Sequence, residues 1–209
     1  MALRRLSGAF AILACAASTA QVIEFESGGL TYQTLTKNGL TIMFARLPTH
    51  IKDYSILQVA VSNGSQTSWS IKPEDFSFQR EDGSGLGGAP VKEVILKLMQ
   101  SGGRGDVIKL VQTYEMGIYG LSRYKSTNGY EQRRQAAFGA VTSTKLKSAA
   151  AASAVALGPT KLAPGKSTDG AVFFEHSGKG LGSGKIVVKA AGEVFQFDAM
   201  EQKPGSHSN

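Results

Sequence analysis

Cysteine is almost absent from this sequence, because Cys15 is the only one among 209 residues. The chain after this position therefore has no disulfide and no thiol chemistry, and the fold must depend on its core alone. Histidine is also scarce: the chain has only His50, His176 and His207, with no HxxH or HxH spacing. Such a sequence offers no ligand set for a structural zinc ion, and we expect no cofactor.

Charge is sparse as well. Charged residues make up 19% of the chain, whereas 42% of the residues are hydrophobic and 25 are glycine. This composition excludes a coiled coil or a disordered acidic tail and favours many turns between strands. The formal charge of +7 falls to +5 without Arg4 and Arg5, and the basic residues are not interleaved with stacking aromatics. We therefore expect no binding to nucleic acid.

The first 20 residues have the three parts of an export signal. Arg4 and Arg5 precede an apolar run over residues 6–17, and small residues follow it. The run is shorter than the roughly 20 apolar residues of a bilayer-spanning helix. We expect residues 1–20 to be a signal peptide and the protein to be exported, to the periplasm, to an outer-membrane tether or to the outside of the cell.

Two processing routes fit this signal. The letters STA at residues 18–20 satisfy the small-x-small rule of ordinary signal peptidase. The letters ILAC at residues 12–15 are similar to a bacterial lipobox, in which the cysteine becomes the acylated first residue, although Leu13 is bulkier than usual there. Both routes stay open, and a lipid on Cys15 is the only membrane attachment that we expect.

Residues 21–89 have the pattern of antiparallel strands. In GGLTYQTLTKNGLTIMFARL, two β-favouring runs flank Asn38 and Gly39, a pair that readily supplies the positive φ angles of a tight hairpin. Further along, Tyr54, Ile56, Val59 and Val61 lie near period two. Strands of this kind have one buried face and one solvated face.

Helical spacing replaces this pattern between residues 90 and 158, where we expect about four short helices. Alternation returns over residues 159–200, and residues 201–209 are expected to form a flexible tail. A helical block between two sets of strands indicates one β structure with an insertion, because alternating βαβ units are absent. The expected fold class is mainly β: an antiparallel immunoglobulin-like β-sandwich with an inserted helical subdomain, α+β overall.

Two stretches carry a resemblance to a known family. VAVSNGSQTSWSIKPEDFSFQREDG, at residues 59–83, resembles the paired-strand signature of telokin-like, immunoglobulin-type sandwiches of bacterial envelope proteins. LAPGKSTDGAVFFEH, at residues 162–176, is similar to the later part of that signature. The resemblance covers about half of the chain and implies a fold, whereas it says little about function. The helical block departs from the family.

The other motifs favour ordinary structure over chemistry. GSGLGG at residues 83–88 fits GxGxxG, but the strand before it is half polar, so we interpret the segment as a flexible hinge. Glu175 and His176 point to opposite faces of a strand and cannot form an acid-base pair. Asp169 is interpreted as a turn residue and Asp106 as a helix N-cap. No nucleophile with its base is apparent, and we expect no catalysis.

NGYEQRRQAAFG, at residues 128–139, is the candidate working surface. On a helix, Tyr130, Arg133 and Arg134 fall on one side, and tyrosine and arginine are common interface anchors. Residues 91–149 hold ten basic and four acidic residues, so the positive charge is concentrated here. The alternative is a solvated helix face with an internal ion pair to Glu131.

The sequence thus indicates a non-catalytic exported module of the bacterial envelope that binds a protein partner through its helical block. The alternative is a periplasmic binding protein for an anionic lipid or glycan, held in a cleft between sandwich and helices with Arg133 and Arg134 as contacts.

Overall fold

The computed structural model describes residues 21–199 except 102, 103, 122, 123, 128, 140–142, 177 and 179. The expected signal peptide with Cys15 and the expected tail at residues 201–209 lie outside the described residues.

Five antiparallel strands form the first sheet, in the order β1-β2-β3-β4-β9. Their bounds are β1 (Ile23–Ser27), β2 (Leu30–Lys37), β3 (Leu40–Ile51), β4 (Tyr54–Asn63) and β9 (Ser167–Glu175). The hairpin predicted at Asn38 and Gly39 is confirmed, because both residues have positive φ (47° and 76°) and Lys37 pairs with Leu40 across the turn. The first sheet is thus built by local hairpins, except for β9.

A second antiparallel sheet has the order β11-β10-β6-β7. Its strands are β6 (Phe76–Arg80), β7 (Gly85–Gly87), β10 (Gly184–Ala190) and β11 (Glu193–Ala199), and a small sheet pairs β5 (Trp69–Ile71) with β8 (Thr160–Leu162). A 3-10 turn, η1 (Pro73–Asp75), connects β5 to β6. The glycine-rich segment at 83–88 is therefore not the predicted hinge, because its centre pairs with β6 as strand β7.

The two larger sheets pack face to face around one hydrophobic core. Phe44 from β3 meets Phe197 from β11 edge to face, with ring centroids 4.9 Å apart. Leu57 and Val59 from β4 are fully buried in the same core. The inward faces of both sheets carry aromatic and branched residues, as the alternating sequence pattern predicts.

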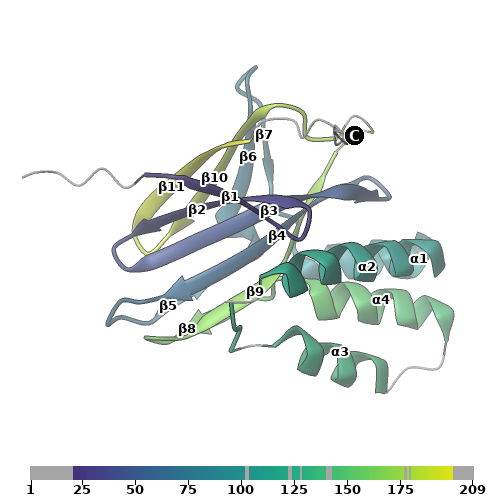
Figure 1. Cartoon of the computed structure of the whole chain (residues 1–209). Helices are drawn as coiled ribbons and strands as arrows, with labels where there is room; N and C mark the ends of the chain where they lie inside the picture. The colour runs from purple at the N-terminus through teal and green to yellow at the C-terminus, as the bar shows by residue number, and fades with distance from the viewer. Residues whose placement is uncertain are drawn as a thin grey trace, which may run out of the picture.

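Four helices cover the other face of the first sheet (Figure 1). They are α1 (Val91–Ser101), α2 (Arg104–Gly120), α3 (Tyr130–Gly139) and α4 (Thr144–Val155). Their apolar side chains, such as Val94, Leu98 and Leu110, pack with Tyr54 and Ile56 of the sheet in a second core. The molecule has three layers, and the first sheet is the middle one.

The middle position explains a difference from the sequence prediction. Strand β4 was expected to have one solvated face, yet nine of its ten residues are buried. Leu57 and Val59 face the second sheet, whereas Tyr54 and Ile56 face the helices. A fold of mainly antiparallel β with four helices is confirmed, but the helices form a layer that shares a core with the sheet.

Among the residues that the structure describes, no helix has the length and apolar character needed to cross a bilayer.

Removal of residues 90–158 is expected to abolish folding. The deletion would expose Tyr32, Tyr54, Ile56 and Phe173, each at most 1% exposed in the intact protein. Uncovered apolar surface of this size favours aggregation over a stable sheet. Near-ultraviolet circular dichroism and analytical ultracentrifugation of the shortened protein, beside the full chain, would check this. A monomer with cooperative unfolding would contradict the shared core.

Candidate binding surface on the helical layer

Tyr130, the first of the predicted contact residues, begins α3 and points inward. Its side chain is 4% exposed, and its ring lies 5.0 Å from the ring of Tyr114 on α2. The hydroxyl donates to Glu115 Oε1 at 3.1 Å. Burial raises the pKa of Tyr130, and the charge of Glu115 raises it further, so the phenol stays a protonated donor. Tyr130 anchors α3 to α2 and cannot serve as the expected surface contact.

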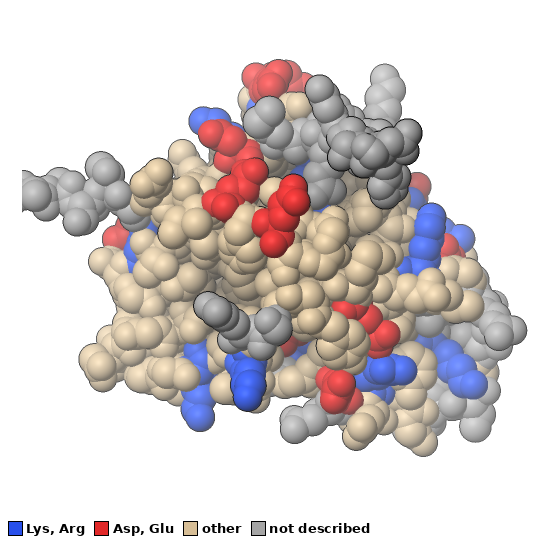
Figure 2. Space-filling view, in the orientation of Figure 1, with Lys and Arg blue, Asp and Glu red and all other residues tan. Residues whose placement is uncertain are grey.

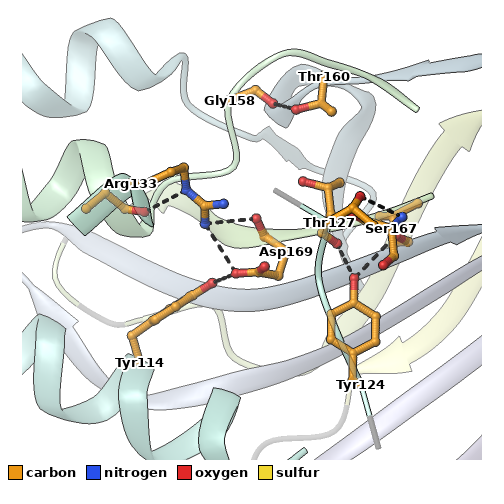
Figure 3. Close-up of polar contacts among 11 residues, drawn as sticks. Tyr114, Tyr124, Thr127, Arg133, Gly158, Thr160, Ser167 and Asp169 are labelled. Atoms are coloured by element: carbon orange, nitrogen blue, oxygen red, sulfur yellow. Dashed lines mark hydrogen bonds and ion pairs between the residues drawn. The ribbon is translucent and has the colours of Figure 1, made fainter. Parts of the chain in front are cut away.

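Arg133, the second predicted residue, also points inward, toward β9. Its Nε donates to the carbonyl of Ala154 on α4 at 3.1 Å, and Nη2 lies 3.2 Å from Asp169 Oδ2 (Figure 3). The side chain of Arg133 is 20% exposed, and that of Asp169 is 1% exposed. The prediction of an exposed arginine was wrong because its partner lies 36 residues away in sequence, on a strand.

Asp169 is the centre of this buried polar group, which we call the Asp169 cluster: Tyr114, Arg133 and Asp169. The interpretation of Asp169 as a turn residue was wrong, since it lies inside β9 opposite Ala60. The Tyr114 hydroxyl donates to the same oxygen, Oδ2, that accepts from Arg133. Burial raises the pKa of Tyr114 well above its ordinary value, and the negative charge of Asp169 adds to the effect.

A second set of contacts holds the segment between α2 and α3 against β9. The Tyr124 hydroxyl donates to the carbonyl of Thr168, and the backbone N–H of Thr127 donates to the carbonyl of Ser167 at 2.9 Å (Figure 3). Burial raises the pKa of Tyr124. The helical layer is therefore fixed to β9 both by a charged cluster and by main-chain hydrogen bonds.

Arg134 is the one predicted residue that reaches the surface, with a side chain 46% exposed. Its Nη1 lies 2.9 Å from Glu115 Oε1, so its charge is paired within the chain. Arg134 is also part of a groove between α2 and α3 with a volume of about 710 Å³. The groove is lined by Ile108, Val111, Gln112, Glu131, Arg134, Gln135 and Phe138.

The groove lies elsewhere than the expected cleft between sandwich and helices. That interface is filled by the second core, in which Leu110 and Tyr114 of α2 pack against the sheet. The groove opens on the outside of the helical layer, and Ile108 is 44% exposed in it. Asp106, expected as the N-cap of α2, lies inside the first turn of that helix and pairs with Lys52 at 3.3 Å.

Comparison of the chain with protein-family models, with curated proteins and with solved structures finds no match. The chemistry of the surface must therefore be judged from its own residues.

A cluster without any signal in the sequence lies where β3 ends and β4 begins. Ser55 Oγ is 3.1 Å from His50 Nδ1, and the rings of His50 and His176 have centroids 5.3 Å apart. These residues meet only because β3 and β9 both pair with β4. Glu175 binds Lys97 at 2.6 Å on the other side of the strand, as its alternation with His176 predicts.

This cluster resembles a nucleophile with a base, but its surroundings favour a structural role. Ser55 is 4% exposed, and the N–H groups of Gly178 and Gly180, which could stabilise an oxyanion, donate instead to His176 Nδ1. Because Nδ1 of His176 accepts these hydrogen bonds, it carries no proton, and the ring is in its neutral form. Within the described part of the chain, no three His, Cys, Asp or Glu side chains converge as metal ligands.

Replacement of Asp169 by asparagine is expected to lower the free energy of unfolding by about 3 kcal/mol, because the partly buried Arg133 would keep its charge without a counter-ion. Arg134→Gln breaks the exposed pair with Glu115 and should cost less than about 1 kcal/mol. Urea unfolding of both variants and the original protein would measure the difference. Equal losses would contradict the structural role of the Asp169 cluster.

Acidification is expected to destabilise the protein through His176. Burial lowers the pKa of His176 in the fold, and the nearby His50 lowers it further. The unfolded chain therefore binds more protons than the folded one below about pH 6.5, and the free energy of unfolding falls as the pH falls.

The variant His176→Asn keeps an acceptor for the glycine N–H groups and removes the titrating ring. Urea unfolding at pH 7.5 and pH 5 should therefore show a smaller loss for this variant than for the original protein. An unchanged pH dependence would assign the effect to other groups.

Proposed function

We propose that the protein is a non-catalytic binding module of the bacterial envelope whose helical layer holds a segment of a partner protein in the groove between α2 and α3. The observation that carries the proposal is this groove, which keeps Ile108 exposed beside Val111 and Phe138. Apolar side chains left open in a concave surface favour a binding site. Residues 1–20, with the features of an export signal, support the envelope location.

A protein segment fits the groove better than an anionic lipid or glycan. Both arginines proposed as anion contacts already have carboxylate partners, Arg133 in Asp169 and Arg134 in Glu115. The rim also carries the acidic Glu131, which repels an anion. Gln112 and Gln135 supply donors and acceptors of the kind that peptide groups bind.

For the fold, we propose that the two larger sheets correspond to the immunoglobulin-type sandwich that the sequence resembles. The two stretches that carry the resemblance are joined by Asn63, which is fully buried. Its amide donates to the carbonyls of Thr67 at 2.8 Å and Leu162 at 2.9 Å, and its Oδ1 accepts from the N–H of Ser65 at 3.0 Å. The face-to-face packing of antiparallel sheets supports the same proposal.

The groove can be tested by site-specific photo-crosslinking in native envelopes. A photo-reactive amino acid at Gln112, in the groove, should give one reproducible crosslinked partner, whereas the same amino acid at Lys147, on the exposed side of α4, should not. Ile108→Asp should remove the crosslink, because a carboxylate in an apolar contact weakens binding.

Leu146→Asp is the matched control, since Leu146 is also 44% exposed but lies outside the groove. It should leave the crosslink intact. A crosslink that survives Ile108→Asp, or that both variants abolish equally, would overturn the proposal.

A further inference from the structure

Strand β1 leaves one of its two edges without a partner among the described residues. The β1–β2 hairpin turns at Gly28 and Gly29, both with positive φ (58° and 75°), so Ser27 and Leu30 flank a two-residue turn. In such a hairpin, the backbone groups of every second residue point to the partner strand. Those of Glu24 and Glu26 therefore point away from β2, toward solvent.

The opposite edge of the same sheet is covered. The N–H of Leu157 donates to the carbonyl of Ala171 at 2.9 Å, and the N–H of Ala89 donates to that of Phe173 at 2.7 Å. The N–H of Thr127 likewise donates to the carbonyl of Ser167. Proteins usually protect sheet edges, because an open edge is a template for another strand. The contrast marks β1 as the edge that is available.

The side chains of β1 differ between its two faces. Ile23 and Phe25 lie on the helix side of the sheet and are 62% and 37% exposed, with Phe25 stacked on Tyr32 at 5.5 Å. Glu24 and Glu26 alternate with them and are exposed on the other side. Figure 2 shows a group of acidic side chains over β1 and the strands above it in this view. The edge is apolar on one side and negative on the other.

A second copy of this chain is a poor occupant of this edge. In an antiparallel pair of β1 strands centred on Phe25, Glu24 of one copy faces Glu26 of the other, and a parallel pair places the same acidic rows side by side. Like charges opposite each other destabilise strand pairing. Acidic residues on an edge are a known means of preventing self-association.

We propose that β1 is a site of strand addition for a partner segment that alternates apolar and basic residues. Its backbone would bond to the outward-pointing N–H and C=O groups of Glu24 and Glu26, its basic side chains would face the two carboxylates, and its apolar side chains would cover Ile23 and Phe25. This site shares no residue with the groove between α2 and α3, and it does not depend on the function proposed there.

Three fluorescent peptides can test the site by anisotropy on the full chain. One alternates valine and lysine, the second alternates valine and glutamate, and the third has the composition of the first in two separate blocks. The first should bind saturably and the other two about tenfold more weakly or not at all, because only the first matches both faces of β1. Equal binding of the first and the third would overturn the proposal.

Two variants separate strand addition from simple charge attraction. Glu26→Pro removes an outward N–H and leaves the hydrogen bonds to β2, so it should abolish binding of the first peptide. The double variant Glu24→Lys/Glu26→Lys keeps the outward backbone N–H groups and reverses the charge of the strand. It should therefore bind the valine–glutamate peptide more tightly than the valine–lysine peptide. Circular dichroism would check that each variant folds. If Glu26→Pro does not fold, the peptide preference of the Glu24→Lys/Glu26→Lys variant decides the test. The proposed partner would be wrong if the lysine variant still preferred the valine–lysine peptide. It would also be wrong if the original protein self-associated and Glu26→Pro removed that self-association.

Discussion

Both faces of the first sheet are apolar, and the positions of the other two layers follow from the need to cover them. Residues of β4 alternate between a core shared with the second sheet and a core shared with the helices, with Val59 in the first and Ile56 in the second. A sheet of this kind is stable only between two layers, because either face alone would expose large side chains to water. The helices are therefore part of the fold and not an addition to it.

Polar contacts determine where the helical layer lies on this sheet. Apolar packing alone permits neighbouring arrangements, whereas a buried carboxylate must find its own counter-ion, and Asp169 pairs with Arg133 at one position of α3. Gly117 adds a steric condition, because a methyl group there would lie 1.8 Å from Gln58 Oε1. The carbonyl of Gly117 also accepts from the Tyr32 hydroxyl at 3.1 Å. Close approach and charge pairing together fix the layer.

Local signals in the sequence predicted the hairpin at Asn38 and Gly39, the four helices between residues 90 and 158 and the return of strands after them. Two failures are local, the hinge at residues 83–88 and the N-cap at Asp106, whereas the others involve contacts between distant segments. Arg133 looks like a solvated residue until β9 brings Asp169 beneath it, and the pattern of β4 looks half exposed until helices cover it. Ser55 and His50 are close in sequence, but His176 joins them only through strand pairing. Sequence periodicity describes one helix or strand at a time, whereas each of these sites is formed by residues from several elements.

The place of β9 in the chain has a consequence for how the protein folds. Ser167 pairs with Ser62, so the whole helical block lies between two strands that are neighbours in the sheet. Closing so long a loop is slow, and the hairpins from β1 to β4 can form first, since their contacts are local. Until β9 arrives, the edge of β4 and one face of the sheet have no cover. A chaperone that binds extended apolar strands would find its best target in this interval, and β4 would be the segment that it holds.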